Sequence, residues 1–175
     1  MELIKIEPDK LKLNPVDIWL NQWFLLTSGD LNKYNTMTVA WGSIGVMWNL
    51  PMVQVVVRPT RYTFEFMEKY SSFSLCGFPR QYKPDLSLLG SKSGRDGDKI
   101  AETNLTICKS DKIEAPCFKQ AELIMECRKI YCQRMDPQKF TDPEIEKNYP
   151  QKDYHQIYFG EIVQIRADKF KFSGE

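Results

Sequence analysis

The chain has 175 residues, and its 24 Lys and Arg, 23 Asp and Glu and one His give a formal net charge of +1. This length favours a single domain over residues 1–175, and 42% hydrophobic residues are enough for an ordinary core, which argues against disorder. The charge balance argues against nucleic-acid binding, which needs a strongly basic face, and one His cannot supply a two-histidine zinc site.

Five cysteines are present without a CxxC pair, so the usual spacings of zinc sites and dithiol redox motifs are missing: Cys76, Cys108, Cys117, Cys127 and Cys132. Their number is odd, and the N-terminus lacks the apolar segment of a signal peptide. We expect reduced thiols, mostly packed as small hydrophobic side chains, in a cytoplasmic protein. No stretch reaches the roughly 18 apolar residues of a membrane span.

Most of the predicted elements, taken in chain order, are strands. Short apolar or alternating runs predict strands over residues 23–28, 36–42, 52–58 and 73–78, the first of them ending at a Gly29-Asp30 turn. Two longer strands follow, a half-buried or interfacial one at 122–135 and another at 156–166. In the last strand Gly160 indicates a bulge or a close backbone approach. The pattern there puts four apolar residues on one side: Ile157, Phe159, Val163 and Ile165.

Helical signals are fewer. Residues 62–70 can form about two helical turns, although their dense aromatic residues leave a strand open. Residues 85–91 predict a helix capped by Asp85 or Ser87 and ended by Gly90, and 139–149 is a polar insertion with one short helix near Asp142. Many short strands with few helices indicate a closed barrel or a sandwich. The motifs GxGxxG, Walker A and GxSxG are missing, so the usual dinucleotide folds and nucleophile-elbow hydrolases have no support.

The strand over 36–42 offers a face suited to a flat ligand. Hydroxyl-bearing and small residues alternate there with larger apolar ones, in the order Asn35, Thr36, Met37, Thr38, Val39, Ala40 and Trp41. A face of hydroxyls, backbone groups and little bulk fits a flat heteroaromatic ring with a polar edge. The alternative is an ordinary half-exposed strand whose threonines reflect β-propensity.

Residues 58–63 predict an anion site where a strand ends and a helix begins. Free N–H groups at a helix N-terminus attract anions, and Arg58 and Arg61 add charge and forked donors. Thr60 and Thr63 add hydroxyl donors. The combination fits a terminal phosphate monoester. In the alternative interpretation, Thr60 merely caps the helix and the arginines are solvated.

Two further features are weaker when taken alone. Residues 91–99 combine glycines, serines and basic residues, so they form either a mobile loop that folds over an anionic ligand or a plain surface loop. His155 begins the last strand, with Asp153 as a candidate partner on the same face. A solitary His is more often a structural hydrogen-bonding residue than a catalyst.

Taken in order, these segments resemble the flavin reductase-like, FMN-binding split-barrel family, and in particular its flavoredoxin-like branch. The resemblance extends from Pro15 to Arg166. It is carried by residues 35–41, by Pro51 and the Val-rich strand into 58–63, by 93–99, by 113–116, by Glu126-Cys127, and by His155 with 160–163.

The resemblance implies a mainly β fold, namely a six-stranded antiparallel Greek-key split barrel with a few short helices, which forms a homodimer with FMN near the subunit interface. By position it implies that the isoalloxazine ring is lined by Asn35, Thr36, Met37 and Thr38, with Trp41 nearby. It further implies phosphate ligands at Arg58, Thr60, Arg61 and Thr63. The residues that would close over the flavin or its phosphate, from the same or the facing subunit, are Lys92, Ser93 and Lys99. His155 would lie at the nicotinamide side as the candidate catalytic residue.

The implied chemistry is hydride transfer from NAD(P)H to bound FMN, followed by electron transfer to a free flavin or a protein acceptor. Three classes of function stay open: an FMN-dependent oxidoreductase, a non-enzymatic FMN-binding electron carrier reduced by a partner protein, and a split barrel without flavin. The stretch 136–153 is rich in Pro and charge, and its equivalence within the family is open.

Overall fold

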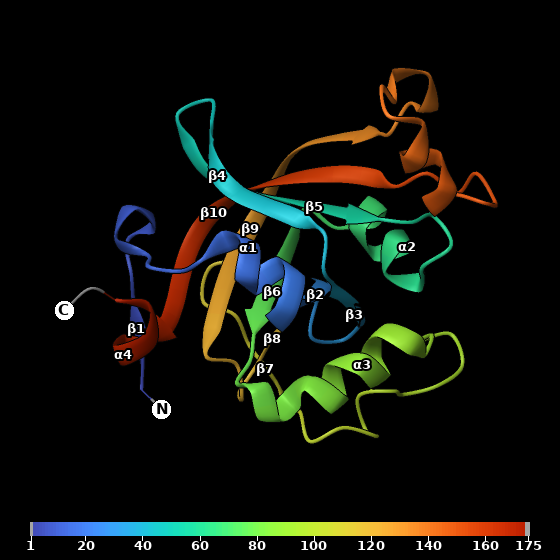
Figure 1. The fold of residues 1–175 in the computed structure, drawn as a ribbon. Coiled ribbons are helices and arrows are strands. Elements are labelled where there is room, and N and C mark those ends of the chain that lie inside the picture. Colours follow the sequence, from blue (N-terminus) through green and yellow to red (C-terminus); the bar gives the residue numbers. More distant parts are fainter. Residues whose placement is uncertain (1, 174–175) are drawn as a thin grey trace.

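Antiparallel strands dominate the computed structural model, which describes residues 2–173 (Figure 1). The main sheet contains β1 (Leu3–Lys5), β2 (Phe24–Gly29), β3 (Tyr34–Val39), β4 (Gly42–Met47), β5 (Leu50–Val57), β6 (Ser72–Gly77), β9 (Leu123–Arg134) and β10 (Gln156–Asp168). A separate ladder joins β7 (Ile107–Cys108) to β8 (Cys117–Phe118). The six strands predicted from the sequence are all present, so the expected mainly β class is confirmed.

The main sheet follows the order β3-β2-β6-β9-β10-β5-β4, with β1 alongside β10. Its two ends, β3 and β4, are neighbours in sequence but share no ladder in the described part of the chain. The fold is therefore split-barrel-like. The predicted number of six strands is too small, because β1 and β4 bring the sheet to eight. β1 has only three residues and β4 is a largely exposed edge strand, so neither carries a clear apolar pattern.

The core lies on both sides of the central strands. Phe24 and Leu26 of β2 pack inside the barrel against Phe73 of β6. Leu25 and Cys76, which alternate with them, pack in a second cluster that includes residues of α3 and the 105–118 segment. Because neighbouring strand residues face opposite sides, a strand covered on both faces reads as a continuous apolar run, as β2 does.

β10 departs from the regular alternation that the sequence predicts. Its pairing with β9 shifts between Phe159 and Gly160 and again between Ile162 and Gln164. At the second shift the extra residue is Val163 of β10, which is 37% exposed, and the side chains after it change face, so Ile165 is buried whereas Ile157 and Phe159 are only half-buried. The predicted single face that included Val163 is therefore wrong. Both expectations for Gly160 are confirmed, because a Cβ there would also lie 2.5 Å from the Phe73 ring.

Two helices flank the barrel. The alternative of a strand over 62–70 is excluded, because α2 runs over Tyr62–Lys69 with Arg61 as its N-cap residue. α3 (Lys83–Ser91) begins two residues before the predicted start and includes Gly90. No side chain caps α3, and the Asp85 carboxylate instead accepts hydrogen bonds from the backbone and side-chain nitrogens of Asn104.

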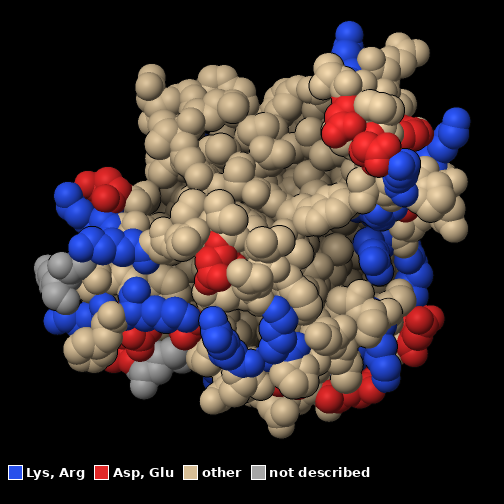
Figure 2. Space-filling view, in the orientation of Figure 1, with Lys and Arg blue, Asp and Glu red and all other residues tan. Residues whose placement is uncertain are grey.

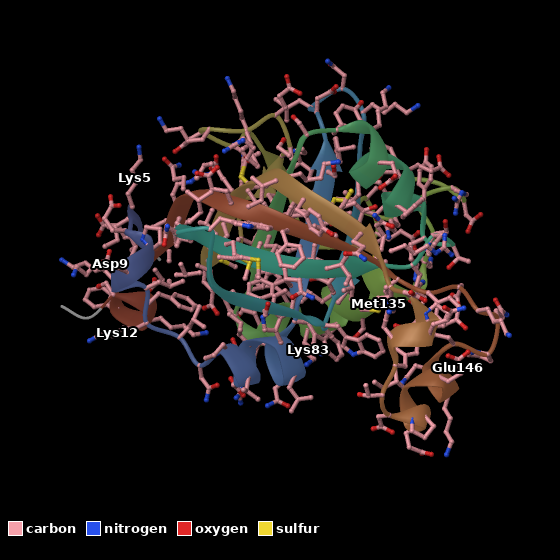
Figure 3. All side chains as sticks on the ribbon, turned by 90° about the horizontal axis from the view of Figure 1, so that it is seen from above. Lys5, Asp9, Lys12, Lys83, Met135 and Glu146 are labelled. Carbon is pink, nitrogen blue, oxygen red and sulfur yellow. The ribbon has the colours of Figure 1, made fainter. Side chains whose placement is uncertain are left out.

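The polar insertion after β9 forms two short 3-10 helices, η4 (Pro137–Lys139) and η5 (Pro143–Asn148), and Asp142 caps the second as expected. Seen from above, the segment labelled at Met135 and Glu146 stands out from the barrel at the end away from Lys5 and Asp9 (Figure 3). The remaining helical segments are η1 (Pro8–Lys10), α1 (Pro15–Asp17), η2 (Ile18–Gln22), η3 (Arg80–Tyr82) and α4 (Lys169–Phe172).

All five cysteines are free: Cys76, Cys117 and Cys127 are buried, Cys108 is half-buried and Cys132 is exposed. The expectation of thiols packed mostly as small hydrophobic side chains is confirmed. Within residues 2–173 no helix is both long and apolar enough to cross a membrane.

Candidate functional site

A hollow of about 170 Å³ opens where β3, the end of β5 and the start of β10 meet. It is lined by Met37, Thr38, Val39, Ala40, Trp41, Val56, Arg58, Arg61 and His155. Residues from segments far apart in the sequence thus meet in one place, as the flavin resemblance requires. In the space-filling view, uncharged residues cover the upper centre of the visible face, and charged side chains gather at its left, right and lower margins (Figure 2).

The strand face predicted for a flat ligand is only partly available. Met37, Thr38 and Trp41 line the hollow, and the Thr38 hydroxyl donates to the Leu86 carbonyl of α3. Thr36 is fully buried, and its hydroxyl bonds to the Leu26 carbonyl at 3.1 Å. Thr36 and Thr38 lie on one face of β3, as expected from their spacing, but the Thr36 side chain is buried between β2 and β3 and does not line the hollow.

Asn35 belongs to a neighbouring hollow that also includes Tyr62, Gly94 and Lys99. Its side-chain amide nitrogen donates to the Thr63 hydroxyl at 2.7 Å, and Thr63 is buried in the first turn of α2. A Cβ at Gly94 would lie 2.1 Å from the Asn35 amide oxygen, so only glycine permits this approach. The hydrogen bond between Asn35 and Thr63 thus joins β3 to α2, and the 91–99 loop comes close to Asn35 at Gly94.

His155 lies at the edge of the first hollow and is only 8% exposed. Its Nδ1 shares a hydrogen bond of 2.8 Å with the Tyr149 hydroxyl, and its ring centroid lies 5.2 Å from that of Trp41. Burial, reinforced by the Arg58 guanidinium, lowers the pKa of His155 to about 4, although the Asp153 carboxylate opposes this shift. The imidazole is therefore neutral at pH 7.

Arg58 is held by the polar insertion. Its Nη1 donates to Asp153 Oδ1 at 2.8 Å, its Nη2 donates to the Asn148 carbonyl at 2.8 Å, and the guanidinium lies 5.0 Å from the centre of the Tyr149 ring. Asp153 was a candidate partner of His155, but it pairs with Arg58, and Tyr149 bonds to His155 instead.

The N-terminus of α2 has no side-chain cap. Thr60 was the alternative cap, yet the N-cap residue is Arg61, and Thr60 is exposed with its carbonyl accepting from Arg95 at 3.2 Å. The first backbone N–H groups of an α-helix have no intrahelical acceptor, so an uncapped first turn attracts anions. The exposed Arg61 side chain lies beside this turn and lines the hollow.

The 91–99 loop is tied to the protein rather than free. Lys99 Nζ is buried and donates to the Leu89 carbonyl at 2.7 Å and to the Lys92 carbonyl at 3.0 Å. Burial, with a contribution from Arg61, lowers the pKa of Lys99 to about 8. The Lys92 side chain pairs with Glu102, and the Ser93 hydroxyl accepts from the Arg95 backbone at 3.2 Å.

Of the predicted site residues, the structure brings six to the first hollow: Met37, Thr38, Trp41, Arg58, Arg61 and His155. Thr60, Lys92 and Ser93 line neither hollow. Tyr149 was missed as a site residue, because no motif marks a tyrosine six residues before the histidine it contacts. Val56 lines the hollow from a strand that was predicted, but its apolar pattern gave no reason to select it.

This arrangement defines a class of protein: a split-barrel-like β fold with an apolar strand face beside an uncapped helix and a guanidinium. Such a site suits a flat ring that carries an anion. The model of the flavin reductase like domain matches residues 21–173. The chain therefore belongs to the flavin reductase-like family, whose members bind FMN.

Individual relatives agree with this family. An uncharacterized protein of Pyrococcus abyssi is 24% identical over 153 residues, which cover 86% of this chain and 76% of that protein. The FMN-binding domain of a flavin reductases-like enzyme from Shewanella baltica has a TM-score of 0.70 at 17% identity, with 96% of this chain and 78% of that one covered. Flavoredoxin from Methanosarcina acetivorans has a TM-score of 0.65 at 24% identity, with 97% and 77% covered. At these identities the solved structures show a shared fold.

Proposed function

We propose that this chain binds FMN at the hollow beside β3 and acts as an NAD(P)H-dependent flavin reductase or flavoredoxin-type oxidoreductase. The observation that carries the proposal is the uncapped N-terminus of α2, with the exposed Arg61 next to it, at the edge of a hollow lined by Met37, Thr38 and Ala40. When bound, FMN supplies the redox chemistry, taking a hydride from NAD(P)H and delivering electrons to a flavin or protein acceptor.

The residues present fit both parts of this cofactor. Met37, Thr38 and Ala40 provide the strand surface against which the ring would lie. The α2 N–H groups and Arg61 provide hydrogen-bond donors for the phosphate. Arg58 lines the same hollow, but its guanidinium is already bonded to Asp153 and Asn148 and has fewer donors left for a phosphate. Lys99 holds the 91–99 loop against α3 and adds positive charge near Arg61.

His155 is the residue we assign to the nicotinamide side of the site. Its imidazole is neutral, and if the Tyr149 hydroxyl donates to Nδ1, the ring proton is on Nε2. A neutral donor held by Tyr149 can orient a nucleotide without adding charge. Trp41, 49% exposed and next to His155, offers an aromatic surface for a nicotinamide ring.

The absorbance spectrum of the purified protein tests the proposal. A flavin band near about 450 nm is expected, and anaerobic mixing with NADH or NADPH should bleach it. Reduction only by a partner protein, with no bleaching by either nucleotide, would overturn the reductase assignment in favour of an electron carrier. A colourless protein whose thermal midpoint does not rise with added FMN would overturn cofactor binding itself, because a ligand of the native state must stabilise it.

The proposal includes a homodimer built on the tip of the β4–β5 hairpin. Val46 is 73% exposed and Trp48 57% exposed, and the Trp48 ring lies 6.0 Å from those of Tyr131 and Phe159. An apolar aromatic patch of this kind is typical of an interface. Light scattering should give a dimer mass that Trp48→Asp reduces to a monomer, whereas Val16→Asp, at an exposed site on α1, should not change it. A dimeric Trp48→Asp protein would exclude this surface.

The five free thiols support a reducing, cytoplasmic setting for this activity.

A further inference from the structure

The small ladder between β7 and β8 brings two cysteines face to face. Cys108 and Cys117 are directly paired residues of these antiparallel strands, and their Sγ atoms are 3.2 Å apart. Nine positions separate them in the sequence, so no CxxC spacing marks them. Neither residue lines the hollow assigned to the flavin. The pair is therefore a feature that the proposed function leaves unused.

Their backbone positions suit a covalent bond. Residues directly opposite in an antiparallel ladder have Cα atoms roughly 4.5–5.5 Å apart, which lies within the range of roughly 4.4–6.8 Å found for disulfides. An S–S bond is about 2.05 Å long, so the sulfurs need to approach by only about 1.2 Å from their present separation. Side-chain rotation can supply this without moving either strand.

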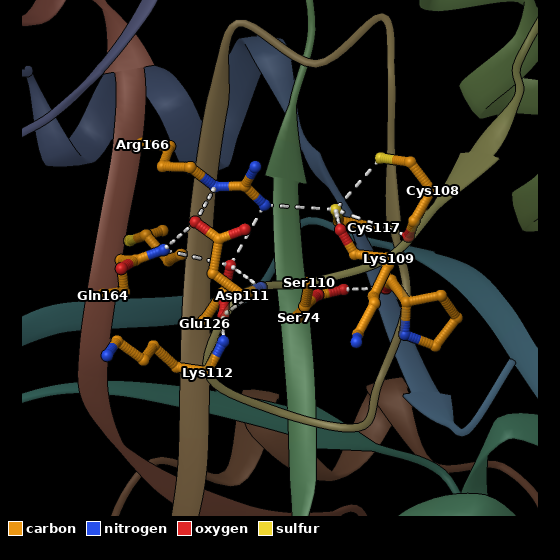
Figure 4. A network of polar contacts seen from close by, with 12 residues as sticks. Ser74, Cys108, Lys109, Ser110, Asp111, Lys112, Cys117, Glu126, Gln164 and Arg166 are labelled. Carbon is orange, nitrogen blue, oxygen red and sulfur yellow. Dashed lines mark hydrogen bonds and ion pairs between the residues drawn. The ribbon is translucent and has the colours of Figure 1, made fainter.

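The surroundings favour a thiolate on one of the two sulfurs. Arg166 Nη2 lies 3.4 Å from Cys117 Sγ, on the side away from Cys108 (Figure 4). The hydrogen bond between the two sulfurs, together with Ser110 and Arg166, lowers the pKa of Cys117 to about 7, against the opposing effect of burial. The same contact and burial raise the pKa of Cys108 in turn.

Acidic groups hold the arginine in place. Arg166 Nη2 also donates to the buried Glu126 carboxylate at 3.0 Å, and its Nε lies 3.6 Å from Asp111 Oδ2. Glu126 in turn accepts hydrogen bonds from the backbone nitrogens of Asp111 and Lys112 at 2.6–3.1 Å. These bonds anchor the connection between β7 and β8 to β9 without using either sulfur, so the hairpin keeps its place when the sulfurs change state.

Access to the pair is one-sided. Cys117 is fully buried, whereas Cys108 is half-buried and is the sulfur that an external molecule can reach. The buried Cys117 sulfur has the contact with Arg166, and Cys108 is the more exposed residue of the pair. Together they have the division between an entry thiol and a resolving thiol that thiol–disulfide exchange needs.

We propose that Cys108 and Cys117 form a reversible dithiol–disulfide centre that exchanges two electrons with a low-molecular-weight disulfide. In the first step Cys108 Sγ bonds to one sulfur of the external disulfide, its proton passes to the Cys117 thiolate, and the other half leaves as a thiolate. That thiolate takes the proton back from Cys117, and Cys117 Sγ then attacks Cys108 Sγ and displaces the second external thiolate. The protein loses two electrons in forming one S–S bond, and the external disulfide gains them as one thiol and one thiolate.

Counting free thiols in the whole chain tests this centre independently of any flavin. The protein is equilibrated in buffers of reduced and oxidised glutathione, quenched with acid, alkylated after unfolding, and weighed intact. We expect five alkyl groups under reducing conditions and three under oxidising ones, without a retained glutathione, and reversal on adding reduced glutathione. Peptide mapping should place the bond between Cys108 and Cys117.

Two variants sharpen the result. Cys132→Ser removes the exposed cysteine, so it should fall from four alkyl groups to two and exclude a bond between molecules. Cys108→Ser should keep four under all conditions, and its half-exposed position keeps the fold intact even if Cys117→Ser fails to fold. Five labels in every buffer, a stable glutathione adduct on Cys108, or a bond to Cys76 instead would overturn the proposal.

Discussion

Arg61→Ala is the substitution that most directly tests the phosphate corner. The Arg61 side chain is exposed, and its closest polar contact is the Gly90 carbonyl at 3.5 Å, at the limit of a hydrogen bond. Its backbone N–H bond to the Arg58 carbonyl at 3.0 Å is unaffected by truncation. The stability of the protein should therefore change by less than about 0.5 kcal/mol, as at other surface positions. A hydrogen bond to a charged group contributes about 1.5–3 kcal/mol, so the Kd for FMN should rise about 10- to 150-fold.

The assay compares two ligands. Fluorescence titration with FMN and with riboflavin, which lacks the phosphate, should show a large loss for FMN and almost none for riboflavin. Arg128→Ala serves as the matched control, because Arg128 is also exposed but lies on β9, where it pairs with Glu161 of β10 and does not line the hollow. Unchanged FMN affinity, or equal weakening of both ligands, would refute the phosphate role of Arg61.

Three further outcomes follow from the same contacts. His155→Asn should leave FMN bound but slow its reduction by NAD(P)H in stopped-flow experiments, and a normal rate would restrict His155 to a structural role. The pKa of His155 is about 4 in the folded protein against 6.5 for the free side chain, so the unfolded state takes up a proton first as the pH falls. Urea unfolding should therefore show stability declining between about pH 6.5 and 4, and the His155→Asn variant should lack that part of the decline. Gly160→Ala should lower the unfolding free energy by about 1–3 kcal/mol, because its Cβ would lie 2.5 Å from the Phe73 ring; an unchanged thermal midpoint would contradict this packing.

Strand positions could be predicted from the sequence because buried strands require apolar residues in runs or at alternating positions. β2 and β5 are apolar runs closed by turn residues, and both appear within two residues of the predicted bounds. β4 could not be found in this way, since most of it is exposed and Gly42 is selected by a close approach to the Trp19 ring and the Gln54 carbonyl. Gly160 indicated the first register shift, between Phe159 and Gly160, but the second, between Ile162 and Gln164, could not be found, because register depends on pairing with β9 and not on the order of side chains alone.

The candidate site could likewise be predicted only in part from the sequence. Residues within one local turn, such as Arg58 and Arg61, could be grouped from the sequence because a strand end and a helix start fix their neighbourhood. The partners of His155 and Arg58 come from the polar insertion, and only the tertiary fold selects Tyr149 for one and Asp153 for the other. Cys108 and Cys117 are also brought together only by the tertiary fold. Their ladder has two residues in each strand, which is too short to produce a periodic pattern in the sequence.

The near-zero net charge of the chain takes on a local meaning at this site. Four basic residues were expected to gather around one phosphate, but Arg58 is paired with Asp153 and Lys92 with Glu102. Lys99 is buried, and its ammonium group already donates to the Leu89 and Lys92 carbonyls. Of these four, Arg61 is the exposed cation next to the uncapped turn of α2. We therefore expect a phosphate at this position to be held by one exposed guanidinium and by backbone N–H groups, an arrangement that suits one small anion in a protein with almost no net charge.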